Sequence, residues 1–150
     1  AFLRSLNRED LAYPGFPWGR WEWMTTHSML DRSSLGRIGI WEDDGDIVGL
    51  VTYESVLGDA YLFTAKGYEG LRGDLLDHAT EAISGEKGIR VNIDDNDRAL
   101  QRAARDRGFI ATPDQETTAM LDITADLRYR PPEGFRFVST ADRRAFGRHH

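Results

Sequence analysis

The sequence predicts an α/β domain on a mixed β-sheet, followed by a short linker. Two patterns carry this prediction. The first is a β-hairpin around Asp44-Gly45, and the second is a later strand, helix, strand, helix order of the kind that pairs strands in parallel through a crossover. The length of 150 residues, with 40% hydrophobic and 29% charged residues, is ordinary for one globular core.

Composition excludes several classes of function. The chain has no cysteine, which excludes disulfides, thiolate zinc sites and cysteine nucleophiles. Its net charge of −6 is spread along the chain and disfavours a nucleic-acid partner. No apolar run approaches the roughly 20 residues that a membrane span needs. No secretory signal is recognisable either, so we expect a soluble cytoplasmic protein without membrane contact.

An aromatic segment opens the chain, where Tyr13, Phe16 and three tryptophans crowd together. Apolar spacing predicts a loop and then a helix from Trp18 to about Leu30. The aromatic side chains suit either an acceptor wall or a domain interface, because rigid aromatic surface favours buried contacts. Ordinary core packing is the alternative interpretation.

Three short strands are expected next, at Arg37–Trp41, Ile47–Glu54 and Asp59–Ala65. The first two are rich in isoleucine, valine and aromatic residues, and Asp44-Gly45 between them suits the positive φ angles of a tight turn. We therefore predict an antiparallel meander of three strands.

After the third strand, the spacing of apolar residues changes from the alternation of a strand to the spacing of a helix. Leucine, alanine and isoleucine recur at helical spacing from Leu71 to Ile83, with Gly85 where a helix cap is expected. Gly88–Ile93 alternates as a strand, and Asp94–Asp97 offers capping side chains for a helix that ends at Gly108. We expect the new strand to lie parallel to the third strand of the meander.

Closing strands are predicted at Phe109–Thr112 and Thr117–Ile123. Tyr129–Gly134 contains two consecutive prolines and reads as a linker. Phe135–Val138 alternates as a further strand. These patterns place one domain at residues 1–128, with 129–150 as a linker and the beginning of another domain.

This order of elements resembles the GNAT (GCN5-related N-acetyltransferase) family. Gly39–Asp43 with Ile47–Glu54 is similar to the family's central hairpin. Asp94-Asp95-Asn96 followed by Arg107-Gly108-Phe109 is similar to its late strand and helix, and the resemblance covers roughly residues 35 to 123. It implies the acyl-CoA N-acyltransferase fold and transfer of an acetyl group from acetyl-CoA to an amine.

A narrower resemblance concerns both ends of the chain. Trp18–Met24, together with Pro132–Phe135, is similar to bacterial GNAT proteins that carry two such domains in tandem. On this interpretation a second GNAT domain begins after the linker and is the expected partner. The alternative is that Pro132–Phe135 belongs to a simple tail.

The coenzyme A loop of this family follows the pattern Arg/Gln-x-x-Gly-x-Gly/Ala, in which backbone N–H groups hold the pyrophosphate. The matching stretch here, Lys66–Gly73, departs from it and places Glu69 where the anion would lie. By resemblance the cofactor-binding positions are Thr64, Ala65, Gly67, Tyr68, Gly70, Gly73 and Asn96. We expect weak or no acetyl-CoA binding, and the alternative is that the glycines serve only the turn and the helix.

A second departure concerns the catalytic acid. Many family members carry a tyrosine a few residues before Gly-Phe, whereas this chain has Ala103 and Ala104 there. Glu54 and Asp59 are the candidate bases, acting through a water, unless they are merely solvated carboxylates. The two losses together indicate a degenerate copy of an acetyltransferase.

Other sites are expected to be few. Tyr53 joins Trp18, Trp21 and Trp23 as a candidate substrate-binding residue for a small-molecule amine. His27 and His78 lie far from any ligand spacing, so no metal site is expected. A non-catalytic ligand-sensing or dimerisation module on the same fold, acting as a homodimer, is the alternative function.

Overall fold

The computed structural model describes residues 2–9, 18–116 and 131–136. The chain divides into two compact units, Ala1–Thr118 and Ala119–His150. In the second unit only 131–136 is described, where the Phe135 N–H donates to the Pro132 carbonyl at 3.0 Å and forms a turn. Most of the expected strand Phe135–Val138 and its domain therefore stay predictions, and the fold below is that of the first unit.

A four-stranded mixed sheet is the frame of the first unit, in the order β1-β2-β3-β4. Its strands are β1 (Gly39–Asp43), β2 (Asp46–Thr52), β3 (Asp59–Thr64) and β4 (Arg90–Asn92). The first three pair antiparallel and β4 pairs parallel to β3. The predicted meander and the parallel crossover strand are both confirmed.

The hairpin turn between β1 and β2 has the geometry that its sequence demands. Asp44 and Gly45 both have positive φ, at 48° and 84°, and Asp43 faces Asp46 across the turn. Positive φ at both central residues matches the right-handed twist of the flanking strands. A register shift between Trp41 and Glu42 then bends the edge strand β1.

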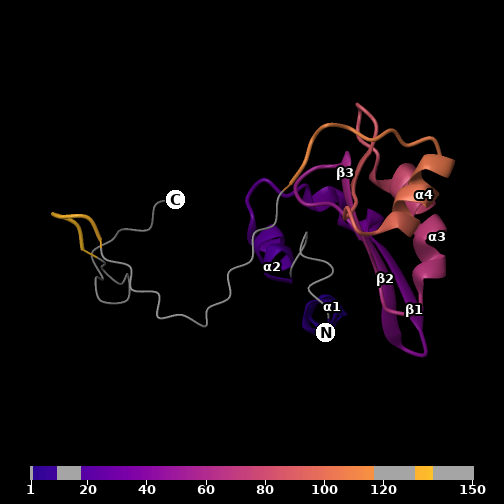
Figure 1. Cartoon of the computed structure of the whole chain (residues 1–150), viewed down its shortest axis with the longest axis horizontal. Coiled ribbons are helices and arrows are strands. Elements are labelled where there is room, and N and C mark those ends of the chain that lie inside the picture. The colour runs from indigo at the N-terminus through magenta and orange to yellow at the C-terminus, as the bar shows by residue number, and fades with distance from the viewer. Residues whose placement is uncertain (1, 10–17, 117–130, 137–150) are drawn as a thin grey trace. The chain divides into compact units, whose positions relative to one another are not determined.

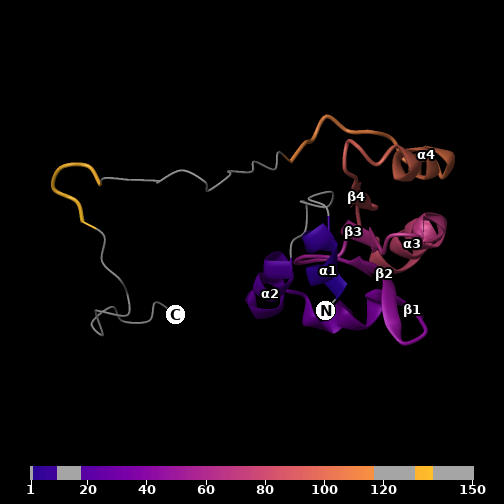
Figure 2. The ribbon, with the colours of Figure 1, turned by 60° about the horizontal axis from the view of Figure 1, so that its bottom comes forward.

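Helices cover both faces of the sheet (Figures 1 and 2). α3 (Arg72–His78) and α4 (Arg98–Asp106) lie on one side, and α1 (Phe2–Glu9) and α2 (Trp18–Thr26) lie on the other. Residues 48–53 and 60–64 are consequently buried without interruption. Burial on both faces explains why these strands read as continuous apolar runs rather than as an alternation.

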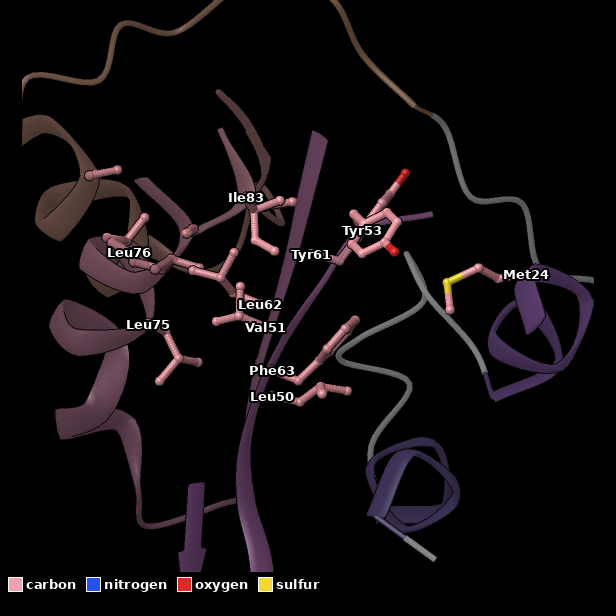
Figure 3. Close-up of a cluster of buried hydrophobic side chains, with 14 of the residues drawn as sticks. Met24, Leu50, Val51, Tyr53, Tyr61, Leu62, Phe63, Leu75, Leu76 and Ile83 are labelled. Carbon is pink, nitrogen blue, oxygen red and sulfur yellow. The ribbon is translucent and has the colours of Figure 1, made fainter. Parts of the chain in front are cut away.

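The core is divided by the sheet into two layers, as Figure 3 shows. Val51 and Leu62 are paired neighbours that point toward α3, while Leu50 and Phe63 are paired neighbours on the opposite face with Tyr61. Met24 of α2 is fully buried there. The further buried members on the α3 side include Leu75, Leu76, Ala79 and Ile83.

The helix expected from Leu71 to Ile83 has three parts: a 3-10 turn at Glu69–Leu71, then α3, then a π-helical turn at Ala79–Ile83. Gly85 was predicted to cap it, and that prediction is wrong. Gly85 lacks a positive φ, and its role is close packing, since a Cβ there would lie 2.7 Å from the Leu57 carbonyl oxygen. The last helical carbonyl, that of Ile83, instead accepts from the Gly58 N–H at 2.8 Å.

Both ends of α4 confirm the sequence prediction. The Asp97 side chain accepts from the Leu100 N–H at 2.9 Å, which makes Asp97 the N-cap. At the other end, Gly108 has φ +83° and donates to Arg105, while Phe109 donates to Ala104. These two bonds form a Schellman motif, which satisfies the last carbonyls of the helix.

The N-terminal helices differ from the prediction. α1 was missed, although Phe2, Leu3 and Leu6 pack against the core at helical spacing. α2 ends at Thr26 rather than near Leu30, because the Arg32 guanidinium donates to the Thr25 carbonyl at 2.7 Å and closes that end. Residues Arg32–Arg37 then form a 3-10 helix, so the first strand begins later than expected.

One closing strand is wrong and the other is untested. Phe109–Thr112 has no strand partner among the described residues, and Ile110 is 88% exposed. The Schellman turn sends Phe109 back toward the core, which interrupts the extended run. The second predicted strand, Thr117–Ile123, lies outside the described residues.

Replacing Gly45 with alanine tests the hairpin. An alanine at φ +84° is strained, so we expect Gly45→Ala to lower the free energy of unfolding by about 1 kcal/mol in urea titration. Gly36→Ala is the control, since Gly36 has open space around it and no positive φ. Equal effects of the two substitutions would contradict this account of the turn.

Candidate functional site

The loop between β3 and α3 is the first candidate site, because the GNAT resemblance predicts cofactor-binding residues there. Gly67 has φ +88° and makes the turn out of β3. The Tyr68 N–H donates to the Ala65 carbonyl at 3.1 Å, and the Leu71 N–H donates to the Tyr68 carbonyl at 2.9 Å. The loop therefore satisfies these backbone donors by its own turns.

The Glu69 carboxylate occupies the donors that remain at the start of this loop. Its Oε1 accepts from the Gly67 N–H at 3.1 Å. The backbone N–H of Glu69 itself, followed by that of Gly67, holds the pKa of the carboxyl below its ordinary value. A negative side chain of the protein thus lies on the amides that an external anion would need.

The two later glycines of the loop differ from each other. Gly70 has open space around it. Gly73 is crowded, since a Cβ there would lie 2.6 Å from Nη2 of Arg107. Arg107 is held in that position by a two-bond contact with Asp77, at 2.6 and 3.0 Å. A side chain at position 73 would therefore displace the Arg107 guanidinium from its place beside α3.

Tyr68 is directed away from the loop and toward the hairpin. Its hydroxyl donates to Oδ2 of Asp43 at 2.6 Å. This hydrogen bond is the main cause that raises the pKa of Tyr68 above its ordinary value. The contact fixes the loop against the tip of the β1–β2 hairpin.

A shallow recess lies beside the loop, where β3 and β4 diverge. Their pairing ends at Tyr61 and Asn92, while β3 continues to Thr64. The recess has a volume of only about 10 Å³, enough for one water molecule, and an ion pair between Arg72 and Asp97 at 2.8 Å borders it. Its lining is Leu62, Phe63, Thr64, Arg72, Leu75, Asp97 and Leu100.

The remaining predicted cofactor residues lie at the edges of this region. Thr64 is buried and lines the recess, and Ala65 is half-buried at the start of the loop. Asn96 is exposed, and its N–H donates to the Asp94 carboxylate at 2.7 Å. Asn96 thus belongs to the turn that precedes α4, while Asp97 caps the helix.

The second candidate site is a polar cluster that joins α2 to the sheet. Arg20 donates two hydrogen bonds to the Glu54 carboxylate, from Nε to Oε1 at 2.5 Å and from Nη2 to Oε2 at 2.6 Å. The same Nη2 also donates to the Tyr61 hydroxyl at 2.9 Å. Planar two-bond contacts of this kind are the strongest that arginine makes with a carboxylate.

This cluster fixes the protonation of its members. Arg20 is the main cause that lowers the pKa of Glu54, and Glu54 is the main cause that raises the pKa of Arg20. Burial raises the pKa of Tyr61 to about 12. At neutral pH the cluster therefore contains a carboxylate, a guanidinium and a neutral phenol, and Glu54 is a poor proton acceptor.

Asp59, the other predicted base, is paired in a similar way with a different arginine. Arg90 lies directly opposite it on β4 and donates to its carboxylate from Nε at 2.6 Å and from Nη2 at 3.0 Å. Tyr61 follows Asp59 by two residues and lies on the same face of β3. Both candidate bases thus stand near one end of the sheet, each in an ion pair.

The predicted acceptor residues are dispersed. Trp18 and Trp23 of α2 are 41% and 49% exposed, whereas Trp21 packs against the core. Arg4 of α1 lies over the Trp18 ring, and the His27 ring packs against Trp23 in a tilted arrangement. Tyr53 is fully buried, and its hydroxyl donates to the Asp31 carbonyl at 2.5 Å.

Sequence reasoning missed the two residues that complete the polar cluster. Arg20 stands between two tryptophans on a short helix, and that single basic residue in an aromatic segment was the available signal. Tyr61 lies two residues after Asp59 and therefore on the same face of β3. Its place in the cluster with Glu54, however, depends on how α2 crosses the sheet. Only the tertiary arrangement unites the three side chains.

The described residues hold no group of three or more histidine, aspartate or glutamate side chains that could bind a metal ion. Over the same part of the chain, no helix is both long and apolar enough to cross a lipid bilayer.

Glu54→Gln tests how much the cluster contributes to the free energy of unfolding. The change removes the charge that neutralises a largely buried guanidinium, and we expect it to lower the free energy of unfolding by about 1 to 2 kcal/mol at pH 7. The folded-state pKa of Glu54 is lowered, so its contribution is present above the unfolded pKa and lost as the pH falls through the folded one. The difference between the two proteins should therefore shrink well below about pH 4.

Glu22→Gln is the matched control, since Glu22 is an exposed acid of the same helix without an ion pair in the described part of the chain. Urea titrations of both variants from pH 3 to pH 8 measure the effect. A pH-independent loss in Glu54→Gln would contradict the ion-pair account.

Comparison with known proteins assigns no family to this chain. No protein-family model, no curated protein and no solved structure matches it. Its fold class, a mixed four-stranded sheet with helices on both faces, rests on its own residues and geometry.

Proposed function

We propose that this chain is a GNAT-type domain that has lost its coenzyme A site and supports an acetyltransferase without catalysing the reaction itself. In this proposal a second GNAT domain, beginning after Pro131-Pro132, transfers the acetyl group from acetyl-CoA to a small-molecule amine. The main support for the proposal is one observation: the Glu69 carboxylate accepts hydrogen bonds from the loop amides.

The order and pairing of the elements support the fold part of the proposal. The antiparallel meander of β1, β2 and β3, the crossover through α3 and the parallel strand β4 follow the order expected for this fold. β3 extends past its pairing with β4, and its residues Leu62, Phe63 and Thr64 line the recess beside the loop.

The loop supports the loss of the cofactor. Glu69 accepts from the Gly67 N–H, so a pyrophosphate would have to displace a carboxylate and then face its charge. Two like charges about 4 Å apart repel by about 1 kcal/mol even in water. The recess is also too small to admit more than one water molecule before the Arg72–Asp97 pair moves.

The catalytic groups support the same conclusion. Neither Ala103 nor Ala104 of α4 carries a hydroxyl that could protonate a thiolate. Arg20 favours the charged form of Glu54 and weakens it as a base, and the Asp59 carboxylate is occupied by two hydrogen bonds from Arg90. No described residue beside the loop replaces these functions.

A second candidate function is a ligand-sensing or dimerising module on the same fold. It is favoured by the outer side of α2, where Trp18 and Trp23 keep much of their surface in solvent. Sedimentation velocity distinguishes the two ideas, because a monomer at all concentrations excludes the homodimer.

Titration calorimetry with acetyl-CoA tests the main proposal. We expect no measurable binding at tens of micromolar protein, because the Gly67, Tyr68 and Leu71 N–H groups already donate within the loop. A micromolar dissociation constant would overturn the claim that the site is lost.

Glu69→Ala tests the reason for that loss. The substitution frees the Gly67 amide and removes one repulsive charge, so affinity for acetyl-CoA should rise by about fivefold or more over the parent chain. Glu81→Ala is the control, since Glu81 is an exposed acid of the same helical segment without an ion pair among the described residues. Equal behaviour of the two variants would mean that Glu69 does not block the loop.

A further inference from the structure

The segment that follows α4, residues 110–116, crosses the molecule without forming a helix or a strand. Figure 1 shows it in orange, leaving α4 and passing above β3 in that view. Phe109 anchors its beginning, since its N–H donates to the Ala104 carbonyl at 3.0 Å and its ring is half-buried against the core. All seven side chains beyond this anchor are exposed.

Two arginines at the end of the sheet face this segment in the same manner. Arg20 uses Nε and Nη2 on Glu54, and Arg90 uses Nε and Nη2 on Asp59. The third nitrogen of each, Nη1, points to an acid of the segment. Arg20 reaches Oε2 of Glu116 at 3.3 Å, and Arg90 reaches Oδ2 of Asp114 at 3.8 Å.

Charge is the main force available to hold the segment there. Residues 110–116 make no backbone hydrogen bond to another residue in the described part of the chain. The side chains of Asp114 and Glu116 are 73% and 60% exposed, and both contacts are longer than the inner pairs of the same arginines. Exposed ion pairs of this kind are weak and are screened by salt.

We propose that residues 110–116 form an acidic strap that closes over the end of the sheet where Glu54, Asp59 and Tyr61 lie, and that ionic strength opens it. Arg20 and Arg90 hold the strap, and we call them its clasps. Each arginine forms an inner pair, with Glu54 or Asp59, that keeps it in place. Each also forms an outer pair, with Glu116 or Asp114, that can separate. Opening the strap separates Glu116 and Asp114 from the two guanidinium groups and leaves the largely buried Arg20–Glu54 pair in place.

The Arg20–Glu54 pair and the two outer contacts respond differently to salt for a physical reason. The Debye length falls from about 30 Å at 0.01 M salt to about 3 Å at 1 M, so exposed pairs longer than 3 Å lose most of their attraction. The Arg20–Glu54 contact is shorter, made by two hydrogen bonds and largely buried, and screening affects it less. A rise in salt should therefore free the strap while α2 stays attached.

A single spin label tests the proposal, because the chain has no cysteine of its own. Thr112→Cys places the label within the strap, at an exposed residue that forms neither of the two ion pairs. The electron paramagnetic resonance spectrum should show restricted motion at 0.02 M NaCl and at least about a twofold faster rotation at 0.5 M. With Asp114→Asn and Glu116→Gln added, the label should rotate fast at both salt concentrations.

Glu86→Gln in the same labelled chain is the control, since Glu86 is an exposed acid without an ion pair among the described residues. It should keep the salt response of the parent. Circular dichroism of each protein verifies that the fold is intact at both salt concentrations. A salt-independent spectrum of the parent, or restricted motion in the doubly neutralised strap, would overturn the proposal.

Discussion

Burial of β2 and β3 on both faces is the constraint on which the rest of the first unit depends. The two strands pair along Gly49–Thr52 and Tyr61–Thr64, and their side chains are removed from water on either side. Two layers of helix are needed to achieve this, so the chain must pass from one face to the other. Every candidate site described above lies where one of these passages begins or ends.

The passage from β3 to α3 is a loop whose backbone groups are bonded within the protein. Gly67 supplies a positive φ there, and Gly73 lies beside the Arg107 side chain. The space near the amides, however, is filled by the protein's own carboxylate. Backbone donors that are satisfied internally stabilise the fold, and they give an external anion nothing to gain.

The passage from α2 to the sheet is governed by charge. Glu54, Asp59, Asp114 and Glu116 would repel one another at one end of the sheet if Arg20 and Arg90 were absent. The two arginines convert that repulsion into a layered arrangement, with tight inner pairs and loose outer ones. Tyr61 is buried beside the inner layer, and its phenol stays neutral in the physiological range.

The sequence by itself determined the local structure wherever a short pattern had one physical solution. Asp44-Gly45 could only make a tight turn, Asp97 and Gly108 marked the ends of α4, and the changes of apolar period separated strands from helices. The parallel crossover followed from the order of these elements. The tertiary structure alone decided which side chains meet, because Arg20 lies 34 residues from Glu54 in the chain and 41 from Tyr61. No spacing rule connects residues so far apart, and Gly85 was misread for the same reason: its role comes from the Leu57 backbone that approaches it in space.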